Sequence, residues 1–254
     1  MLKYNKGEDK MNIKFFRKAI LLIHGFAGGN YDYGSLGNDL QLYNNFDVFT
    51  FTLPGHDKMI IDKVTRKDWI DKAEYEIEKI ISNGYREIYI IGHSMGGVIA
   101  SHLASKYKEV AKLVLAAPAF HYLAFKGNKV DVIESIKKLP NLFKSYDPEE
   151  VLSRLFKIPA TTIKEFMKLV EEHTKDINDI TCPTLILWGN KDDIVPKDSV
   201  LYVYDNIASK SVTLVEINEL THDLFINDRY AEVMHLITRF FRTKPINCKR
   251  QKEI

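Results

Sequence analysis

The chain has 254 residues, of which 45% are hydrophobic and 28% charged, so it can bury a sizeable core. Its 36 Lys and Arg residues against 34 Asp and Glu residues leave a net charge of +2, which argues against nucleic acid as a partner. The charged N-terminal stretch and an apolar run of only five residues at 19–23 lack the pattern of a secretory signal or membrane span, so we expect a cytoplasmic protein without stable membrane insertion.

Short apolar runs rich in β-branched residues recur along the chain and predict strands. Most of the runs are nearly continuous, which is typical of strands that are covered on both faces, as in a parallel sheet. The runs lie at residues 19–23, 48–52, 88–91, 112–116, 184–188 and 212–217.

Between these runs, apolar residues recur with helical spacing. The clearest examples are residues 70–81 and 233–241, where one face of each predicted helix is apolar. Strands that alternate with helices predict an α/β protein with a doubly wound, mostly parallel sheet. No linker or repeat divides the chain, so we expect one domain over residues 1–254 that ends in a short, basic, solvated tail at 244–254.

Residues 120–179 break the alternation, because they show helical periods and no convincing strand. We expect a helical cap, inserted after the strand near 112–116, over the carboxyl ends of the strands, where open α/β sheets bind ligands. Such a cap would line a substrate pocket, although simple packing onto the sheet explains its apolar residues equally well. The candidate lining residues are Phe125, Leu142, Phe143, Phe156, Phe166 and Met167.

Ser94 lies in the segment IIGHSMGGV, between a predicted strand and a predicted helix at 98–105. The pattern G-x-S-x-G is common by chance, so its weight comes from this context. A nucleophilic serine on a sharp strand-to-helix turn needs glycine on both sides, because other side chains would collide with the sheet or the helix. Gly92 and Gly96 meet that requirement, and Ser94 is the predicted nucleophile.

A serine hydroxyl is a poor nucleophile without a base, so an acid and a histidine are expected downstream. The turn in TLILWGNKDDIVP offers Asp192 and Asp193, and the loop in VTLVEINELTHD offers His222. The order serine, acid, histidine fits a triad on such a sheet. We choose Asp192, the acid of a G-x-x-D-x-x-V-P turn, with Asp193 as the alternative; Asp223 is adjacent to His222 and poorly placed to reach its ring.

An acyl-transfer site also needs backbone amides that bind the oxyanion. The amide of Met95, directly after the nucleophile, and that of Phe26, in the loop after the first strand, are the candidates. His24, His56 and His93 lie in tight turns without a carboxylate spacing that makes a metal site, so we expect structural roles and no metal or cofactor.

The chain resembles the α/β-hydrolase superfamily, and most of all its small bacterial carboxylesterases and monoacylglycerol lipases, in the segments ILLIHGFAGG, TLPGH, IIGHSMGG, WGNKDDIVP and THD. The resemblance spans about residues 19–241. It implies cleavage of short- to medium-chain acyl esters or monoacylglycerols through an acyl-enzyme, with Ser94 as nucleophile, His222 as base and Asp192 as its orienting acid. The segment THDLF lacks the glycine that many relatives place before the histidine.

Other functions use the same residues. The triad also serves thioesterases, peptidases that act on N-terminal residues, C–C bond hydrolases and acyltransferases, and the fold also serves ligand receptors with little turnover. A haloalkane dehalogenase is disfavoured, because its nucleophile would be an aspartate at the position of Ser94. We expect a small-molecule ester as the partner, and the sequence does not indicate the oligomeric state.

Overall fold

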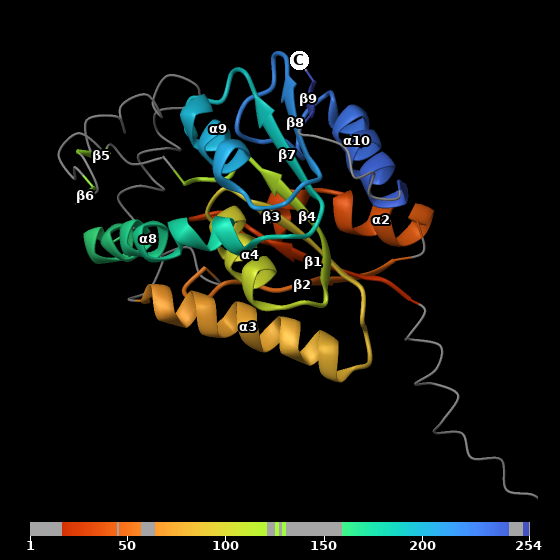
Figure 1. Cartoon of the computed structure of the whole chain (residues 1–254), viewed down its shortest axis with the longest axis horizontal. Helices are drawn as coiled ribbons and strands as arrows, with labels where there is room; N and C mark the ends of the chain where they lie inside the picture. The colour runs from red at the N-terminus through yellow and green to blue at the C-terminus, as the bar shows by residue number, and fades with distance from the viewer. Residues whose placement is uncertain are drawn as a thin grey trace, which may run out of the picture.

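A parallel sheet of seven strands forms the centre of the computed structural model, which describes residues 17–44, 46–56, 64–120, 125–126, 129–130, 159–243 and 251–253 (Figure 1). The strand order is β2-β1-β3-β4-β7-β8-β9. The strands are β1 (Ala19–Ile23), β2 (Asp47–Thr50), β3 (Ile88–His93), β4 (Val110–Ala116), β7 (Thr184–Gly189), β8 (Val212–Ile217) and β9 (Gln251–Glu253). The predicted α/β class with a parallel sheet is confirmed.

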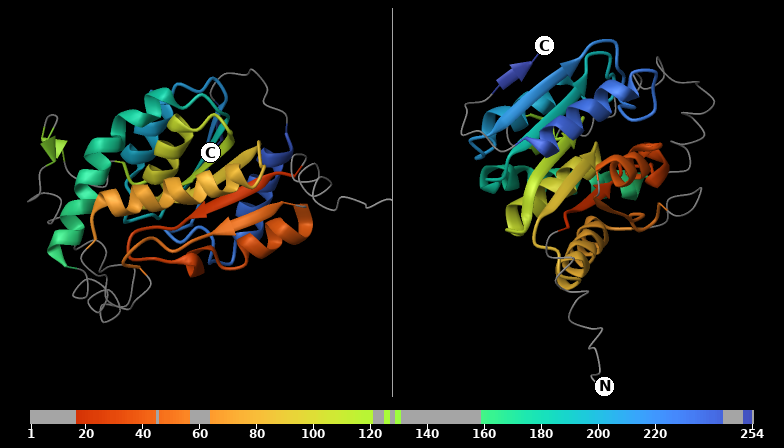
Figure 2. Two further views of the ribbon diagram at one scale, coloured as in Figure 1. Left: turned by 90° about the horizontal axis from the view of Figure 1, so that it is seen from below. Right: turned by 90° about the vertical axis from the view of Figure 1, so that its right-hand side faces the viewer.

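Helices cover both faces of this sheet (Figure 2), as a doubly wound fold requires. On one face α2 contacts α10, and on the other α4 contacts α3, α8 and the short helix η3. The helices are η1 (Asn30–Tyr33), α2 (Leu36–Asn44), α3 (Arg66–Ser82), α4 (Met95–Lys106), α8 (Ala160–His173), η3 (Thr174–Asp179), α9 (Lys197–Asn206) and α10 (Tyr230–Arg242). None of the helices within the described ranges is long and apolar enough to cross a membrane.

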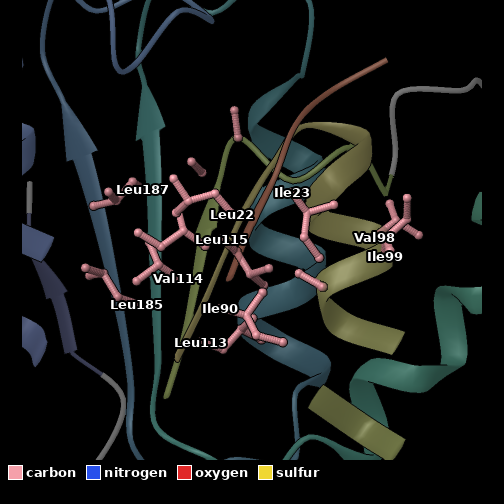
Figure 3. Close-up of a cluster of buried hydrophobic side chains, with 14 of the residues drawn as sticks. Leu22, Ile23, Ile90, Val98, Ile99, Leu113, Val114, Leu115, Leu185 and Leu187 are labelled. Carbon is pink, nitrogen blue, oxygen red and sulfur yellow. The ribbon is translucent and has the colours of Figure 1, made fainter. Parts of the chain in front are cut away.

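The core lies between the central strands and α4 (Figure 3). Every residue of β1 and of β3 is buried, as expected for strands that helices cover on both faces. Leu22, Ile90 and Leu115 come from three neighbouring strands, while Val98 and Ile99 come from the first turns of α4. This packing fixes α4 against the sheet and thereby fixes the turn that precedes it.

The direction in which successive strands are added to the sheet changes between β1 and β3. From β1 the chain runs outward to β2, then returns to β3 on the other side of β1 and continues outward through β4, β7 and β8. Ligands of open α/β sheets bind outside the carboxyl ends of the strands at such a point. The residues that follow Ile23 and His93 therefore lie where the fold favours a site.

The element boundaries agree closely with the sequence pattern. β1 and β8 coincide with their apolar runs, and β3 extends two residues further, to His93. Helix α3 begins at Arg66, before its first apolar stripe residue, because Thr65 and Asp68 form a capping box at its N-terminus.

The expectation that residues 120–179 contain no strand is wrong. Strand β5 (Phe125–Lys126) pairs antiparallel with β6 (Lys129–Val130). The intervening residues, Gly127 and Asn128, are a dipeptide typical of two-residue hairpin turns, and the helical periods around them obscured this signal. Helices α8 and η3 fill the C-terminal part of the segment. Of the candidate pocket residues, Leu142, Phe143 and Phe156 lie outside the described residues, and for Phe125 only the backbone is described.

We expected residues 244–254 to form a solvated tail. This expectation is wrong for residues 251–253, which form β9. Its three residues pair in parallel with residues 213–215 of β8 at the edge of the sheet, whereas residues 244–250 lie outside the described part. The strand is short and polar, so it has no apolar alternation that a sequence pattern would reveal. Short, charged edge strands of this kind discourage further pairing at the edge.

Lys112 in β4 joins the sheet to the C-terminal end of α10. Its Nζ donates to the carbonyl oxygens of Phe240, Phe241 and Thr243 at 2.7, 3.0 and 2.6 Å. The last carbonyls of a helix have no partner within it, and a cation there satisfies them and opposes the negative end of the helix dipole. The lysine is buried despite its charge, because these three carbonyls replace its water.

We predict that Lys112→Met lowers the free energy of unfolding by about 1–3 kcal/mol, because three carbonyl groups lose their donor. Urea denaturation followed by circular dichroism measures the change. The matched control is Lys210→Met at an exposed position before β8, where a change below about 0.5 kcal/mol is expected. Equal, small effects of the two substitutions would contradict the role given to Lys112.

Candidate active site

Ser94 occupies a sharp turn between the end of β3 and the start of α4. Its backbone has φ 54° and ψ −118°, a region that costs a residue with a side chain about 1–3 kcal/mol and persists only where packing enforces it. Packing enforces it here through glycine. A Cβ on Gly92 would lie 2.4 Å from the Gly96 carbonyl oxygen, and a Cβ on Gly96 would lie 1.9 Å from the Ile23 carbonyl oxygen.

The loop after β1 lies against this turn. A Cβ on Gly25 would lie 3.1 Å from the Ser94 Cβ, so the chain passes closely beside the serine. His24 holds the loop from within the core: its Nδ1 donates to the Gly25 carbonyl at 2.9 Å, and its Nε2 accepts from the Leu53 amide at 2.9 Å. Burial lowers the pKa of His24 to about 4, so the ring is neutral and serves the structure.

The two candidate oxyanion donors belong to segments on either side of Ser94. Met95 is the first residue of α4, and the first amides of a helix have no partner inside it. Phe26 follows Gly25 in the loop beside the serine. The N-terminal end of α4 also carries the positive end of the helix dipole, which favours negative charge at this position.

His222 and Asp192 form a buried pair. His222 Nδ1 donates to Asp192 Oδ2 at 2.9 Å, and the other carboxylate oxygen, Oδ1, accepts from the amides of Ile194 and Val195 at 2.9 and 2.8 Å. The Asp192 carboxylate is fully buried. Of the two acids that the sequence offered in this turn, Asp192 is therefore the one that bonds His222.

The environment of His222 favours its charged form. Burial alone would lower the pKa of the imidazole, but the charge and hydrogen bond of Asp192, with smaller contributions from Asp223 and Asp32, raise it above 6.5. The bond from Nδ1 to Asp192 also fixes the neutral tautomer, because it keeps the proton on Nδ1 and leaves Nε2 to accept one.

His93 connects the nucleophile turn to the histidine loop. Its Nε2 donates to the carbonyl oxygen of His222 at 3.0 Å, and the two ring centroids lie 4.7 Å apart. Burial and the neighbouring His222 lower the pKa of His93 to about 3, so the ring is neutral. His93 directly precedes Ser94, so this contact ties the nucleophile turn to the backbone of the histidine loop.

Asp32 is a residue of this site that the sequence pattern did not indicate. It lies in η1, after the loop that carries Phe26. Burial raises the pKa of its carboxyl to about 6, against the effect of backbone hydrogen bonds from Gly29 and Gly25, and its charge acts on His222. A carboxylate oxygen of Asp32 lies 1.9 Å from the position of a Gly28 Cβ, so the loop folds closely around the acid. A lone aspartate between two tyrosines carries no spacing that would have revealed it.

An aromatic group borders the loop after β1. The ring of Phe26 stacks on that of Phe166 from α8, with centroids 5.1 Å apart and planes 16° apart. Trp69 and His56 each lie edge-on to Phe26 at 6.0 Å. Phe166 and the neighbouring Met167 are buried in the core cluster, so α8 does pack next to this loop.

The arrangement supports a defined kind of chemistry. A hydroxyl on a strained turn, a paired histidine and amides at a helix N-terminus can transfer an acyl group from a substrate to the serine. Among the described residues, the group with the geometry of a metal site lies elsewhere, at His102, His173 and Asp176.

Comparison with known proteins identifies relatives along most of the chain. The carboxylesterase of Bacillus subtilis (strain 168) is 24% identical over 229 residues, which cover 86% of this chain and 89% of the relative. The thermostable monoacylglycerol lipase of Bacillus sp. (strain H-257) is 23% identical over 209 residues, covering 80% of this chain and 82% of the relative. A solved structure of metagenome-derived lipolytic enzymes superimposes with a TM-score of 0.71 at 18% identity, covering 89% of this chain and 94% of the other.

The model of the alpha/beta hydrolase family matches residues 20–236, a range that includes most of β1, the turn at Ser94, the turn after β7 that carries Asp192, and the histidine loop. The chain therefore belongs to the alpha/beta hydrolase family.

Proposed function

We propose that the protein is a serine hydrolase that cleaves carboxylic esters through an acyl-enzyme intermediate. The observation that carries this proposal is the strained turn at Ser94, which the ring of the preceding His93 links to the loop of a histidine whose Nδ1 is held by a buried aspartate. Membership of the alpha/beta hydrolase family and similarity to a carboxylesterase and a monoacylglycerol lipase support the choice of ester as the substrate class.

The first half-reaction forms the acyl-enzyme. The Ser94 Oγ attacks the carbonyl carbon of the ester while His222 Nε2 takes the hydroxyl proton. The negative charge that develops on the carbonyl oxygen is stabilised by the amides of Phe26 and Met95, a contribution of about 3–4 kcal/mol for each donor. Asp192 stabilises the imidazolium. The C–O bond of the ester then breaks, and the alcohol leaves with the proton from His222.

The second half-reaction releases the acid. A water molecule gives a proton to His222 and attacks the acyl carbon, the same amides bind the oxyanion, and the bond to Ser94 Oγ breaks as the serine recovers its proton. Every proton passes through His222, so the rate depends on the fraction of this residue that is neutral.

Short- to medium-chain acyl esters or monoacylglycerols are the proposed substrates. The stacked pair of Phe26 and Phe166 places apolar surface directly beside a proposed oxyanion amide. An apolar acyl chain bound there would continue from the carbonyl carbon along α8. Phe166 and Met167 are the described members of the predicted pocket lining, and their role in binding is part of this proposal.

We predict that Ser94→Ala lowers kcat/KM for p-nitrophenyl butyrate at least about a thousand-fold, because no nucleophile remains. Initial rates, together with mass-spectrometric detection of a fluorophosphonate adduct on the wild-type protein, provide the measurement. The matched control is Ser105→Ala, further along the same helix, which should retain wild-type rates and labelling.

Wild-type turnover by Ser94→Ala would refute the proposal. A parallel series with a thioester and an aminoacyl anilide identifies which bond the site prefers. If the wild-type protein is labelled at Ser94 but turns over only one of these substrates, the triad assignment stands and the ester assignment falls. Neither labelling nor turnover would favour a ligand receptor.

The pH dependence of kcat/KM should follow the protonation of His222. Because its pKa is raised and it acts in the neutral form, kcat/KM should fall as the pH decreases, with a midpoint above the usual pKa of a histidine. Asp32 contributes to that raised pKa. Asp32→Asn should therefore move the midpoint to lower pH.

Rate profiles between pH 4 and pH 9 test this expectation. Asp71→Asn, an exposed acid on α3, is the control and should leave the midpoint unchanged. Full activity at pH 4, or a shift of the Asp32→Asn midpoint to higher pH, would contradict the assigned roles.

The acyl-chain preference is tested at Phe166. Phe166→Ala opens space beside Phe26, so kcat/KM for p-nitrophenyl octanoate should rise relative to acetate by roughly tenfold. Ile163→Ala, one turn earlier on α8 and packed against the core, is the matched control. An equal loss for both esters in both variants would show that Phe166 only packs the helix.

A further inference from the structure

A compact group of polar side chains lies on the far half of α4, away from Ser94. His102 of α4, His173 at the end of α8 and Asp176 of η3 bring their ligand atoms within 4.8 Å of one another. His102 Nδ1 and His173 Nδ1 both lie 2.8 Å from the same oxygen, Oδ2 of Asp176. The two imidazole centroids are 4.5 Å apart.

A second carboxylate determines which ring nitrogen of His102 carries a proton. Glu74 of α3 places its Oε1 2.8 Å from His102 Nε2 and 2.6 Å from the Lys106 ammonium. A carboxylate accepts, so Nε2 must carry the ring proton. In a neutral His102 the lone pair of Nδ1 then faces the Asp176 oxygen at 2.8 Å. Two electron-rich atoms this close require a cation that bonds both of them, either a second proton on the ring or a metal ion that lies beside the pair at bond lengths of about 2.0–2.2 Å.

We propose that His102, His173 and Asp176 form a binding site for a divalent transition-metal ion of the zinc class. Two imidazole nitrogens and one carboxylate oxygen are a donor set that suits zinc, nickel or copper, whereas magnesium and calcium require more oxygen ligands. The contact of Glu74 with the far nitrogen of His102 is the carboxylate–histidine–metal arrangement that orients metal-ligating histidines.

The ligands come from three elements that are distant in sequence. α4 contacts both α8 and η3, and Figure 1 shows α8 beside α4. All three ligand side chains are half-buried, so an ion can enter from solvent. The bound ion would tie α8 and η3 to the helix that begins at Ser94, and its effect would be on stability rather than on the reaction.

Isothermal titration calorimetry of the EDTA-treated, dialysed full chain tests the proposal. We expect Zn²⁺ and Ni²⁺ to bind with a stoichiometry of about one and to raise Tm, because the folded state alone assembles the site. Mg²⁺ and Ca²⁺ should do neither. Co²⁺ should give visible bands without a sulfur charge-transfer band, which separates this site from binding at a cysteine.

Four variants locate the ion. His173→Gln and Asp176→Asn should weaken Zn²⁺ binding at least about 100-fold, and Glu74→Gln about 10- to 100-fold. His235→Gln, at an exposed histidine on α10, is the control and should bind like the wild type. Tm in EDTA shows that each variant folds.

Three results would overturn the site. Zn²⁺ binding weaker than roughly 100 µM means that the cluster is held by a proton, which NMR would detect as a His102 imidazolium. Binding that survives both His173→Gln and Asp176→Asn places the ion elsewhere. Binding that is lost in a fifth variant, His222→Gln, and retained in the other four places the ion at the Ser94 site.

Discussion

The close approach of α4 to β1 and β3 is the constraint on which the rest of the structure depends. The Gly96 backbone lies so near the Ile23 carbonyl that a single methyl group would occupy the same space. A helix that starts this close to the sheet must turn sharply out of β3, and Ser94 therefore takes φ 54°. The buried side chains of α4 and the central strands supply the apolar packing that keeps this strained turn in place.

Burial determines the electrostatics at the carboxyl ends of the strands. The Asp192 carboxylate is buried but has three donors, so its charge is compensated and acts on His222. The negative charge of Asp32 is compensated less well, since the pKa of its carboxyl is raised to about 6. An acid with a raised pKa destabilises the folded state as the pH rises through its titration range. Such a group is expected at a functional site rather than in a structural core.

Sequence patterns predicted the central strands, α3, α4 and α10 because their signals are local. Continuous apolar runs and helical stripes depend on what each segment buries, and the same residues are buried in the structure. The choice between Asp192 and Asp193 rested on a turn pattern, and the hydrogen bond to His222 agrees with the choice.

Apart from the hairpin of β5 and β6, the features that were missed have no local signal. β9 contains three polar residues that pair with β8 only because the edge of the sheet is open there. Asp32 acts on His222 across 190 positions of the sequence, and His102 meets Asp176 across 74. Such contacts arise from the arrangement of elements around α4. The spacing of residues along a single sequence does not indicate which of these distant residues meet.

The two ends of α4 are held by different forces, and this difference has consequences for the proposed site. The N-terminal end is fixed by apolar packing and by glycine contacts that tolerate no displacement. Beside the other half of the helix, α8 is held by buried apolar side chains, among them Leu169 and Val170, and by the stack of Phe26 on Phe166. It also makes polar contacts, in which Arg66 bonds Glu165 and Glu172 at 2.7 and 2.6 Å. Exposed ion pairs contribute only about 0–1 kcal/mol each and weaken with salt. The polar contacts of α8 therefore weaken with salt, whereas the nucleophile turn depends on apolar packing and close glycine contacts that salt does not screen.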